Sequence, residues 1–228
     1  MLYRNAAEGI HRIDEASTNW FLVEEARRLT VVDTGFPRSW NTLKQTLGEL
    51  GRSLGDIDAV VLTHAHFDHM GFTERARSEL GVPVWAHERE VPVTEHPWRF
   101  DHERSRLLYA RCPGFLKIFI AMGAKGALWV EGTKDVHTYA ADQQLDVPGR
   151  PRVVFTPGHT HGHSALHFPD RGAVIVGDAF VTVNPYTGST GPQIVAGATT
   201  ADSAQALASL DALARLDVAT ALVGHGDP

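Results

Sequence analysis

The sequence predicts an α/β fold, because short runs of β-branched residues alternate with helical patterns along most of the chain. The 228 residues are 43% hydrophobic and 21% charged, which is ordinary for a globular protein of this length. The alternation occurs in two regions, before about residue 88 and after about residue 145. We therefore expect a single domain over 1–228, with two similar halves and an insertion at about 88–145 between them.

The first half contains four expected strands and two expected helices. The strands are β-branched runs bounded by turn residues, at 19–23, 29–35, 58–64 and 83–87. Two patterns with helical periodicity, 39–51 and 73–81, lie between these strands, and each ends in a glycine stop. Strands and helices that alternate in this way favour a sheet covered by helices.

The second half repeats this organisation with different residues. Four apolar runs are typical of strands, at 152–159, 164–168, 173–180 and 220–225. The segment 201–216 has the amphipathic pattern of a surface helix. No nucleotide-binding glycine motif is present, so the chemistry has to come from other residues.

The insertion at about 88–145 is rich in proline, and we expect helices around 101–111 and 114–123. The second of these helices is apolar. It can pack onto the two halves, which we favour, or act as a lid whose side chains line a pocket. The residues of such a lid would be Phe115, Phe119 and Met122.

Charge and composition exclude several classes of partner. The formal net charge is −6, so we expect no nucleic-acid partner and no membrane association, and instead a small-molecule substrate. The single cysteine, Cys112, rules out an internal disulfide and fits a reducing compartment. Residues 1–18 lack the apolar core of a signal peptide, and we expect a cytoplasmic protein. The oligomeric state is left open.

Four expected strands each end in a potential metal ligand: His64, His159, Asp178 and His225. A glycine stands immediately before the last three, which lets the backbone turn sharply and approach a shared centre closely. Ligand sites in α/β sheets favour the carboxyl ends of strands. If these four ends share one edge of the structure, their side chains converge.

The stretch "THAHFDHMG" adds three further candidates to the first strand end: His66, Asp68 and His69. Alternate residues of an extended segment point the same way, so His64 and His66 can bind one ion together. A turn at Phe67 would direct Asp68 and His69 toward a second position. Imidazole and carboxylate ligands without thiolate suit zinc, while iron or manganese is possible on ligand type.

These motifs, H-x-H-x-D-H at 64–69, PGH at 157–159, GD at 177–178 and GH at 224–225, resemble the metallo-β-lactamase superfamily. They are most similar to its glyoxalase II and lactonase branch. The resemblance covers nearly the whole chain except the insertion, and it implies a four-layer αββα sandwich with the site at one edge. It also implies two zinc ions and their ligands: His64, His66 and His159 for the first, Asp68, His69 and His225 for the second, with Asp178 bridging.

The function that this resemblance implies is hydrolysis of a lactone, thioester or related carbonyl compound by a hydroxide that bridges the two metals. Asp68 would be the catalytic residue that orients the hydroxide. A single-iron enzyme resembling persulfide dioxygenases is the alternative, and an RNA-processing nuclease is disfavoured by the acidic balance. Many typified β-lactamases place arginine or cysteine in the second site, which fits this sequence poorly.

Further residues near the motifs are candidates for orienting a metal-bound imidazole or for contacting substrate. Asp33, in "VVDTG", is expected to orient a metal-bound imidazole without binding the ion itself. His161 stands where the superfamily often has proline, and both His161 and His163 can serve either structural hydrogen bonding or the pocket. Tyr186 lies in 184–193, a turn-rich loop that can also contact substrate. Val181 replaces a tyrosine of lactonase-like members, which counts against a quorum-signal lactonase.

Overall fold

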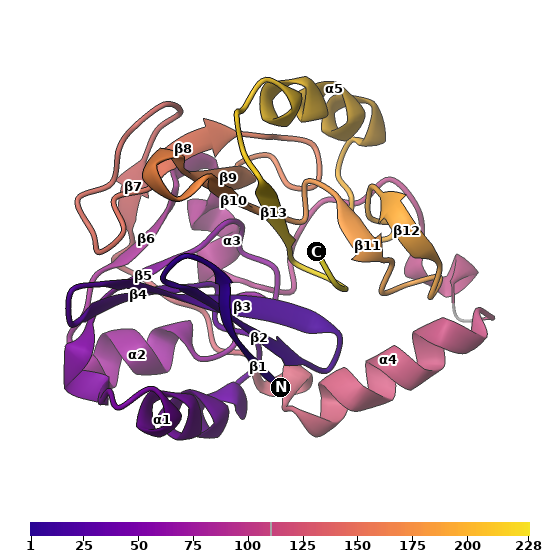
Figure 1. Cartoon of the computed structure of the whole chain (residues 1–228). Coiled ribbons are helices and arrows are strands. Elements are labelled where there is room, and N and C mark those ends of the chain that lie inside the picture. Colours follow the sequence, from indigo (N-terminus) through magenta and orange to yellow (C-terminus); the bar gives the residue numbers. More distant parts are fainter. Residues whose placement is uncertain (110) are drawn as a thin grey trace.

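The two halves form two packed β-sheets in a computed structural model, which describes residues 1–109 and 111–228. Helices α1 (Ser39–Glu49) and α2 (Thr73–Leu80) cover the outer face of the first sheet, and α5 (Ser203–Ala214) covers the second sheet (Figure 1). The order of layers is therefore helix, sheet, sheet, helix. The αββα sandwich predicted from the sequence is confirmed.

The first sheet contains seven strands whose spatial order follows the chain, from β1 to β7. Neighbours from β1 to β4 are antiparallel, and neighbours from β4 to β7 are parallel. The strands are β1 (Leu2–Ala7), β2 (Ile10–Glu15), β3 (Thr18–Glu25), β4 (Arg28–Val32), β5 (Ile57–Val61), β6 (Val84–His87) and β7 (His137–Tyr139).

The second sheet has the order β13-β10-β9-β8, and a separate hairpin of β11 and β12 lies beside it (Figure 1). Only the β10–β13 pair in this sheet is parallel. The strands are β8 (Arg152–Phe155), β9 (Ser164–Phe168), β10 (Ala173–Gly177), β11 (Val181–Val183), β12 (Thr190–Gln193) and β13 (Thr220–Val223).

Side chains alternate between the layers along the central strands. In β3, Trp20 and Leu22 belong to the core beneath α1 and α2, whereas Phe21 packs between the sheets. In β10, Ile175 packs between the sheets and Val174 packs beneath α5. Strands that are buried on both faces read as nearly continuous apolar runs, which is why the sequence predicted them well.

Strands β1 and β2 were not predicted, because β2 buries polar side chains. Arg12 in β2 is 3% exposed, and its guanidinium contacts Asp227 at 2.7 Å and donates to the carbonyl of Gly226 at 2.9 Å. These partners lie more than 200 residues away along the chain. In the sequence this segment therefore looks like a charged, exposed one, whereas in the fold the strand is buried and its arginine is paired.

The insertion agrees with the prediction only in part. Helix α4 (Pro113–Ala124) is confirmed, and α3 (Val91–Glu95) and short 3₁₀ turns at η2 (Glu88–Glu90), η3 (Arg106–Leu108) and η4 (Ala127–Trp129) precede or follow it. The insertion also supplies β7, which joins the first sheet as its edge strand. Two further 3₁₀ turns lie outside the insertion, η1 (Leu54–Asp56) and η5 (Pro169–Arg171).

The helix expected around 101–111 is wrong over its described residues, which form only η3. The backbone N–H of Glu103 donates to Thr200 at 3.0 Å, and that of Arg104 donates to Gly197 at 2.8 Å. Those groups hold this segment against the 195–200 loop. The segment follows this loop and forms only the short turn η3.

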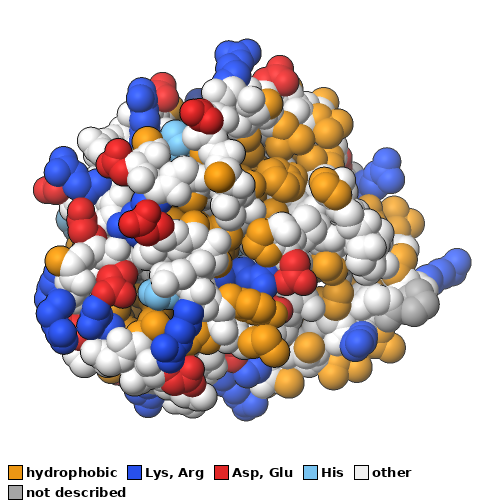
Figure 2. Space-filling model, in the orientation of Figure 1, with side chains coloured by type: hydrophobic (Ala, Val, Ile, Leu, Met, Phe, Trp, Pro, Cys, Tyr) orange, Lys and Arg blue, Asp and Glu red, His pale blue; other side chains and the backbone are white. Residues whose placement is uncertain are grey.

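Helix α4 is apolar on nearly every side. Leu116 and Ile120 on its outer side are 60% and 63% exposed, and apolar side chains are visible along this helix in Figure 2 (lower right). With 12 residues, α4 is too short to cross a bilayer, and no other helix among the described residues meets the length and apolarity needed.

Candidate metal centre

All seven predicted metal ligands lie at one edge of the two sheets, because β5, β8, β10 and β13 end there. None of these residues is more than 6% exposed. They come from four loops that are far apart in the sequence and are His64, His66, Asp68, His69, His159, Asp178 and His225. The convergence of strand ends that the sequence suggested is therefore present, while the ligand role of each residue stays a prediction.

The first group of candidate ligands consists of His64, His66 and His159. Each offers a ring nitrogen, and the three nitrogens lie within 4.8 Å of one another. His66 Nδ1 and His159 Nε2 are 3.0 Å apart. Ligand atoms around one tetrahedral zinc ion, at about 2.0–2.1 Å from it, lie roughly 3.3 Å apart. The group has the size that a single cation requires.

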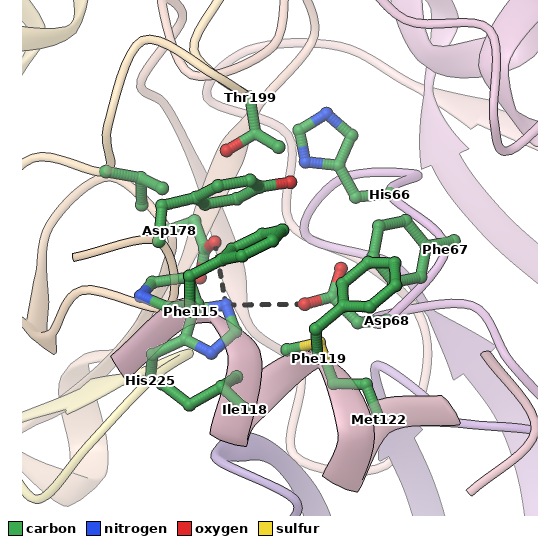
Figure 3. A pocket seen from close by; sticks show the side chains of 13 residues that line it. His66, Phe67, Asp68, Phe115, Ile118, Phe119, Met122, Asp178, Thr199 and His225 are labelled. Carbon is green, nitrogen blue, oxygen red and sulfur yellow. Dashed lines mark ion pairs between the residues drawn. The ribbon is translucent and has the colours of Figure 1, made fainter. Parts of the chain in front are cut away.

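The second group consists of Asp68, His69 and His225, whose candidate atoms also lie within 4.8 Å of one another. His225 Nε2 is 3.5 Å from Asp68 Oδ2, and His69 Nε2 is 3.9 Å from the same oxygen. Figure 3 shows the Asp68 carboxylate directed toward His225 across the floor of a pocket.

The Asp178 carboxylate lies between the two groups. Its Oδ2 is 3.4 Å from His159 Nε2 in the first group and 3.1 Å from His225 Nε2 in the second. Its other oxygen, Oδ1, is 3.6 Å from His69 Nε2. One carboxylate thus faces both groups, which is the position that the resemblance implied for a bridging ligand.

Two of the glycines that precede candidate ligands are required by this packing. Gly177 has a φ of +52°, and a Cβ there would meet Thr63 Oγ1 at 2.7 Å. At Gly224 a Cβ would come within 2.1 Å of Asp178 Oδ1. A side chain at either position would displace the central carboxylate or the loop beside it.

Several buried atoms of the site that can bind a cation lack hydrogen-bond partners among the described residues. His64 Nε2, His69 Nε2 and Asp178 Oδ1 are buried and have no hydrogen-bond partner among the described residues. A buried polar atom without a partner costs free energy. Imidazole and carboxylate donors are the ligands that zinc accepts, so the residues present fit a pair of divalent cations.

Asp33 anchors the loop that carries most of the candidate ligands. Its Oδ1 accepts the Thr63 N–H at 2.8 Å, and its Oδ2 lies 2.9 Å from His69 Nδ1. Its backbone has a φ of +56°, a strained conformation for a residue with a side chain. Both oxygens already have partners, which fits the predicted orienting role better than direct ligation.

Three of the other imidazoles are fixed through Nδ1 in the same manner. The partners are Thr63 Oγ1 for His64 at 3.1 Å, Thr200 Oγ1 for His159 at 3.3 Å and the Ser17 carbonyl for His225 at 2.6 Å. Holding one ring nitrogen fixes the direction of the other. The Nε2 atoms of these rings are thereby directed toward the site.

Glu90, which the sequence reasoning missed, ties the two main loops together. Its Oε2 accepts the Ala65 N–H and its Oε1 accepts the Gly162 N–H, both at 2.8 Å. The side chain is 1% exposed, and burial raises the pKa of its carboxyl against the opposing hydrogen bonds. No motif marks this position, because its partners are backbone groups that any residue provides.

His163 has the structural role that was one of the two alternatives. Its Nε2 accepts the Asp178 backbone N–H at 3.0 Å, and its Nδ1 lies 2.8 Å from Thr156 Oγ1. Burial and the neighbouring His159 lower the pKa of His163 to about 3, so the ring is neutral and can accept. It holds the backbone of the central aspartate.

His161 lies away from the seven residues, on the outer surface. Its side chain is 56% exposed and its Nε2 is 2.9 Å from Asp101 Oδ2. The structure does not bring it to the pocket above the site. Tyr186, in contrast, lines that pocket, and the loop that carries it forms the turn between β11 and β12.

The pocket above the candidate ligands has a polar floor and apolar walls (Figure 3). Side chains of α4 form one wall, and the same helix packs onto the core through Met122 and Ile118, so it combines features of both expectations. The floor residues are His66, Asp68, Asp178 and His225, and the α4 residues are Phe115, Ile118, Phe119 and Met122.

Electrostatics distinguish the two groups of candidate ligands. Burial lowers the pKa of His64 and His66 well below the ordinary value, and that of His159 to about 4. Burial also opposes protonation of His69, but Asp178, Asp68 and Asp33 outweigh it and raise its pKa to about 10. The pKa of His225 is raised for the same reason, chiefly by Asp178 against burial.

Two packed sheets with a His/Asp cluster at one edge define a metallo-β-lactamase fold, and sequence comparison gives the same assignment. The model of the metallo-beta-lactamase superfamily matches residues 13–225. The chain belongs to this superfamily.

Individual relatives and structures extend this assignment. The chain is 29% identical to the "Probable metallo-hydrolase YflN" of Bacillus subtilis, over 98% of this chain and 86% of that protein. It is 29% identical to a hydroxyacylglutathione hydrolase of Gloeobacter violaceus, over 74% of this chain and 52% of the relative. A crystal structure of the metallo-beta-lactamase family protein TTHA1429 from Thermus thermophilus matches with a TM-score of 0.69 and 26% identity, over 96% of this chain and 74% of the other.

Proposed function

We propose that this protein is a dinuclear zinc-dependent hydrolase that cleaves a small ester-like substrate: a lactone, a thioester or a related carbonyl compound. The observation that carries the proposal is the pair of ligand groups on either side of Asp178, beneath a pocket that opens onto Asp68. The family relation and the name of YflN agree with metal-dependent hydrolysis.

Two zinc ions held there would supply Lewis acidity and lower the pKa of a bound water to near 7. The protein's part is to hold them, with His64, His66 and His159 around one and Asp68, His69 and His225 around the other. Asp178 would contact both. Asp33 and Glu90 keep the loops in place while the reaction proceeds.

Asp68 is the residue that we propose to act on the attacking water. Its carboxylate lines the pocket, and Oδ2 lies 3.5 Å from His225 Nε2. A carboxylate oxygen there can accept a hydrogen bond from water and direct it at a carbonyl carbon. Water then adds to that carbon, the bond from carbon to the leaving oxygen or sulfur breaks, and the leaving atom takes the proton.

Tyr186 is the substrate contact that we propose in the same pocket. Burial, and secondarily the charge of Asp68, raise the pKa of its phenol, which therefore keeps its proton at neutral pH. A protonated phenol can donate a hydrogen bond to a substrate oxygen. His161 has no part in this proposal, because its ring is paired with Asp101 on the outer surface.

The test combines metal analysis with a hydrolysis panel. We expect the purified protein to bind two zinc ions per chain and to hydrolyse at least one of a set of esters, lactones, thioesters, lactams and phosphodiesters. Asp68→Asn should reduce that rate by at least about a hundredfold, as loss of a proton-accepting group does. Full zinc loading without hydrolysis of any substrate would contradict the proposal, as would iron in the isolated protein together with oxygen uptake on a persulfide.

A further inference from the structure

We infer that the substrate's acyl portion is uncharged and apolar, an alkyl or aryl group that lies against the pocket walls. This inference rests on the proposed function and narrows it to one class of ester or lactone. It comes from the side chains around the pocket rather than from the candidate ligands at its floor.

One wall of the pocket is made by a single helix. Phe115, Ile118 and Phe119 of α4 project toward the floor, as Figure 3 shows, and Met122 closes the same side. These positions recur every three or four residues, so they share one face of the helix. Met122 also belongs to the core beneath the first sheet and Ile118 packs against that core, so this apolar face contacts both the core and the pocket.

Aromatic rings continue this wall to the hairpin of β11 and β12. The Phe115 ring stacks against Tyr186 with centroids 5.5 Å apart, and against Phe119 with centroids 5.3 Å apart. Pro185 and Val195 line the same side. Two segments about 70 residues apart in the sequence thus form a continuous apolar surface above Asp68 and Asp178.

The charges near the pocket disfavour an ionic substituent. No lysine or arginine is among the described residues that line it. The Arg106 guanidinium carbon lies 4.4 Å from the centre of the Phe100 ring, outside the set of lining side chains. An anionic group that lies against the apolar walls, away from the floor, would lose its water without gaining a lysine or arginine side chain in return. Substrates that place a carboxylate or phosphate against these walls are therefore disfavoured.

The experiment measures kcat/KM of the zinc-loaded protein for 4-nitrophenyl acetate, butyrate, hexanoate and octanoate. We expect an increase of up to roughly fourfold for each added methylene until the wall is filled, the factor that burial of a methylene gives. The 4-nitrophenyl half ester of glutarate, which is anionic, and the 4-trimethylammoniobutyrate ester, which is cationic, should react more slowly than the uncharged ester of similar length.

Helix α4 offers a matched pair of variants. Ile118 lines the pocket, whereas Ile120 lies two residues further along and is 63% exposed. Ile118→Ala should lower kcat/KM for the octanoate ester by about tenfold and leave the acetate ester nearly unchanged. Ile120→Ala should leave the whole series unchanged. Thermal unfolding of both variants separates a pocket effect from a loss of folding.

Binding of non-reactive ketones distinguishes failure of this inference from failure of the proposed function. If no substrate of the hydrolysis panel reacts, the proposed hydrolysis is wrong, but saturation-transfer NMR with 2-butanone, 2-hexanone and 2-octanone still reports on the wall. Affinity that rises with chain length and depends on Ile118 supports the inference. Equal binding of all three ketones, or faster hydrolysis of the glutarate or trimethylammonio ester, would overturn it.

Discussion

The two groups of candidate ligands both contain imidazoles but differ in charge. His64, His66 and His159 form a cluster of neutral imidazoles, because burial lowers their pKa values. His69 and His225 stand between carboxylates, and their pKa values are raised. One edge of the fold therefore holds a neutral group and a group that binds protons, separated by Asp178.

Because of this difference, protons compete with a cation for the imidazole nitrogens of the second group but hardly for those of the first. In the first group the nitrogens are already free at neutral pH. In the second, a cation has to displace protons from the imidazoles before they can act as ligands. The two sites should therefore fill in sequence, the first with little proton release and the second with more.

The largest expected effect comes from removing a ligand of the first group. His159→Ala should reduce zinc binding from two ions per chain to one or fewer. The rate of hydrolysis of any substrate should fall by more than about a hundredfold, which exceeds the usual effect of replacing a residue that only orients a ligand. Elemental analysis and kinetics on the same preparation measure both.

The matched control is His161→Ala, two residues along the same loop. Its side chain is 56% exposed and contacts Asp101, so metal content and rate should stay within about twofold of the unchanged protein. A loss at His161 equal to that at His159 would mean that the loop, and not the imidazole, matters.

The second prediction concerns pH. Because the pKa of His69 is raised to about 10, zinc affinity of the second group should rise with pH, by up to about tenfold per unit between pH 7 and 9. The first group should be nearly independent of pH above about 6, because its pKa values lie below that range. Calorimetry in buffers of different ionisation enthalpy counts the protons released. Equal proton release in both zinc-binding steps would contradict the difference in protonation between the two groups.

The third prediction uses two buried carboxylates, Asp33 and Glu90, which both bind the 63–69 loop, while Glu90 also binds the loop at Gly162. Asp33→Asn weakens the hold on His69 and should lower affinity of the second group by about 10–100-fold. Glu90→Gln leaves one of two backbone N–H groups without an acceptor, at Ala65 or Gly162, and should cost about 1–3 kcal/mol of unfolding free energy. Its effect on zinc should fall mainly on the first group. Zinc titration and thermal denaturation of each variant measure these outcomes, and reversed preferences would contradict the assignment of the carboxylates.

Patterns that are local in the chain predicted the α/β class and the positions of the seven candidate ligands, whereas the αββα order of layers came from the resemblance to the superfamily. Apolar strands such as β5 and β10 are buried on both faces and read clearly. His64, Asp178 and His225 follow such strands directly or within a few residues, so placing the strand ends also placed them.

The features that were not predicted from the sequence depend on contacts between residues that are far apart in the chain. Arg12 reads as a surface charge until its contact with Asp227 is known. Glu90 has no signature, because it acts on backbone groups of two other loops. The backbone of Glu103 bonds to Thr200 where a helix was expected. In each case a partner far away in the chain outweighs the local preference.

The proposed pair of zinc sites is tested most directly by anomalous scattering at the zinc edge from crystals grown with zinc. We expect two peaks per chain. One should lie about 2.0–2.1 Å from nitrogens of His64, His66 and His159, and the other at similar distances from Asp68, His69 and His225. Asp178 should lie between them. Peaks elsewhere on the molecule, or none at this edge of the sheets, would contradict it.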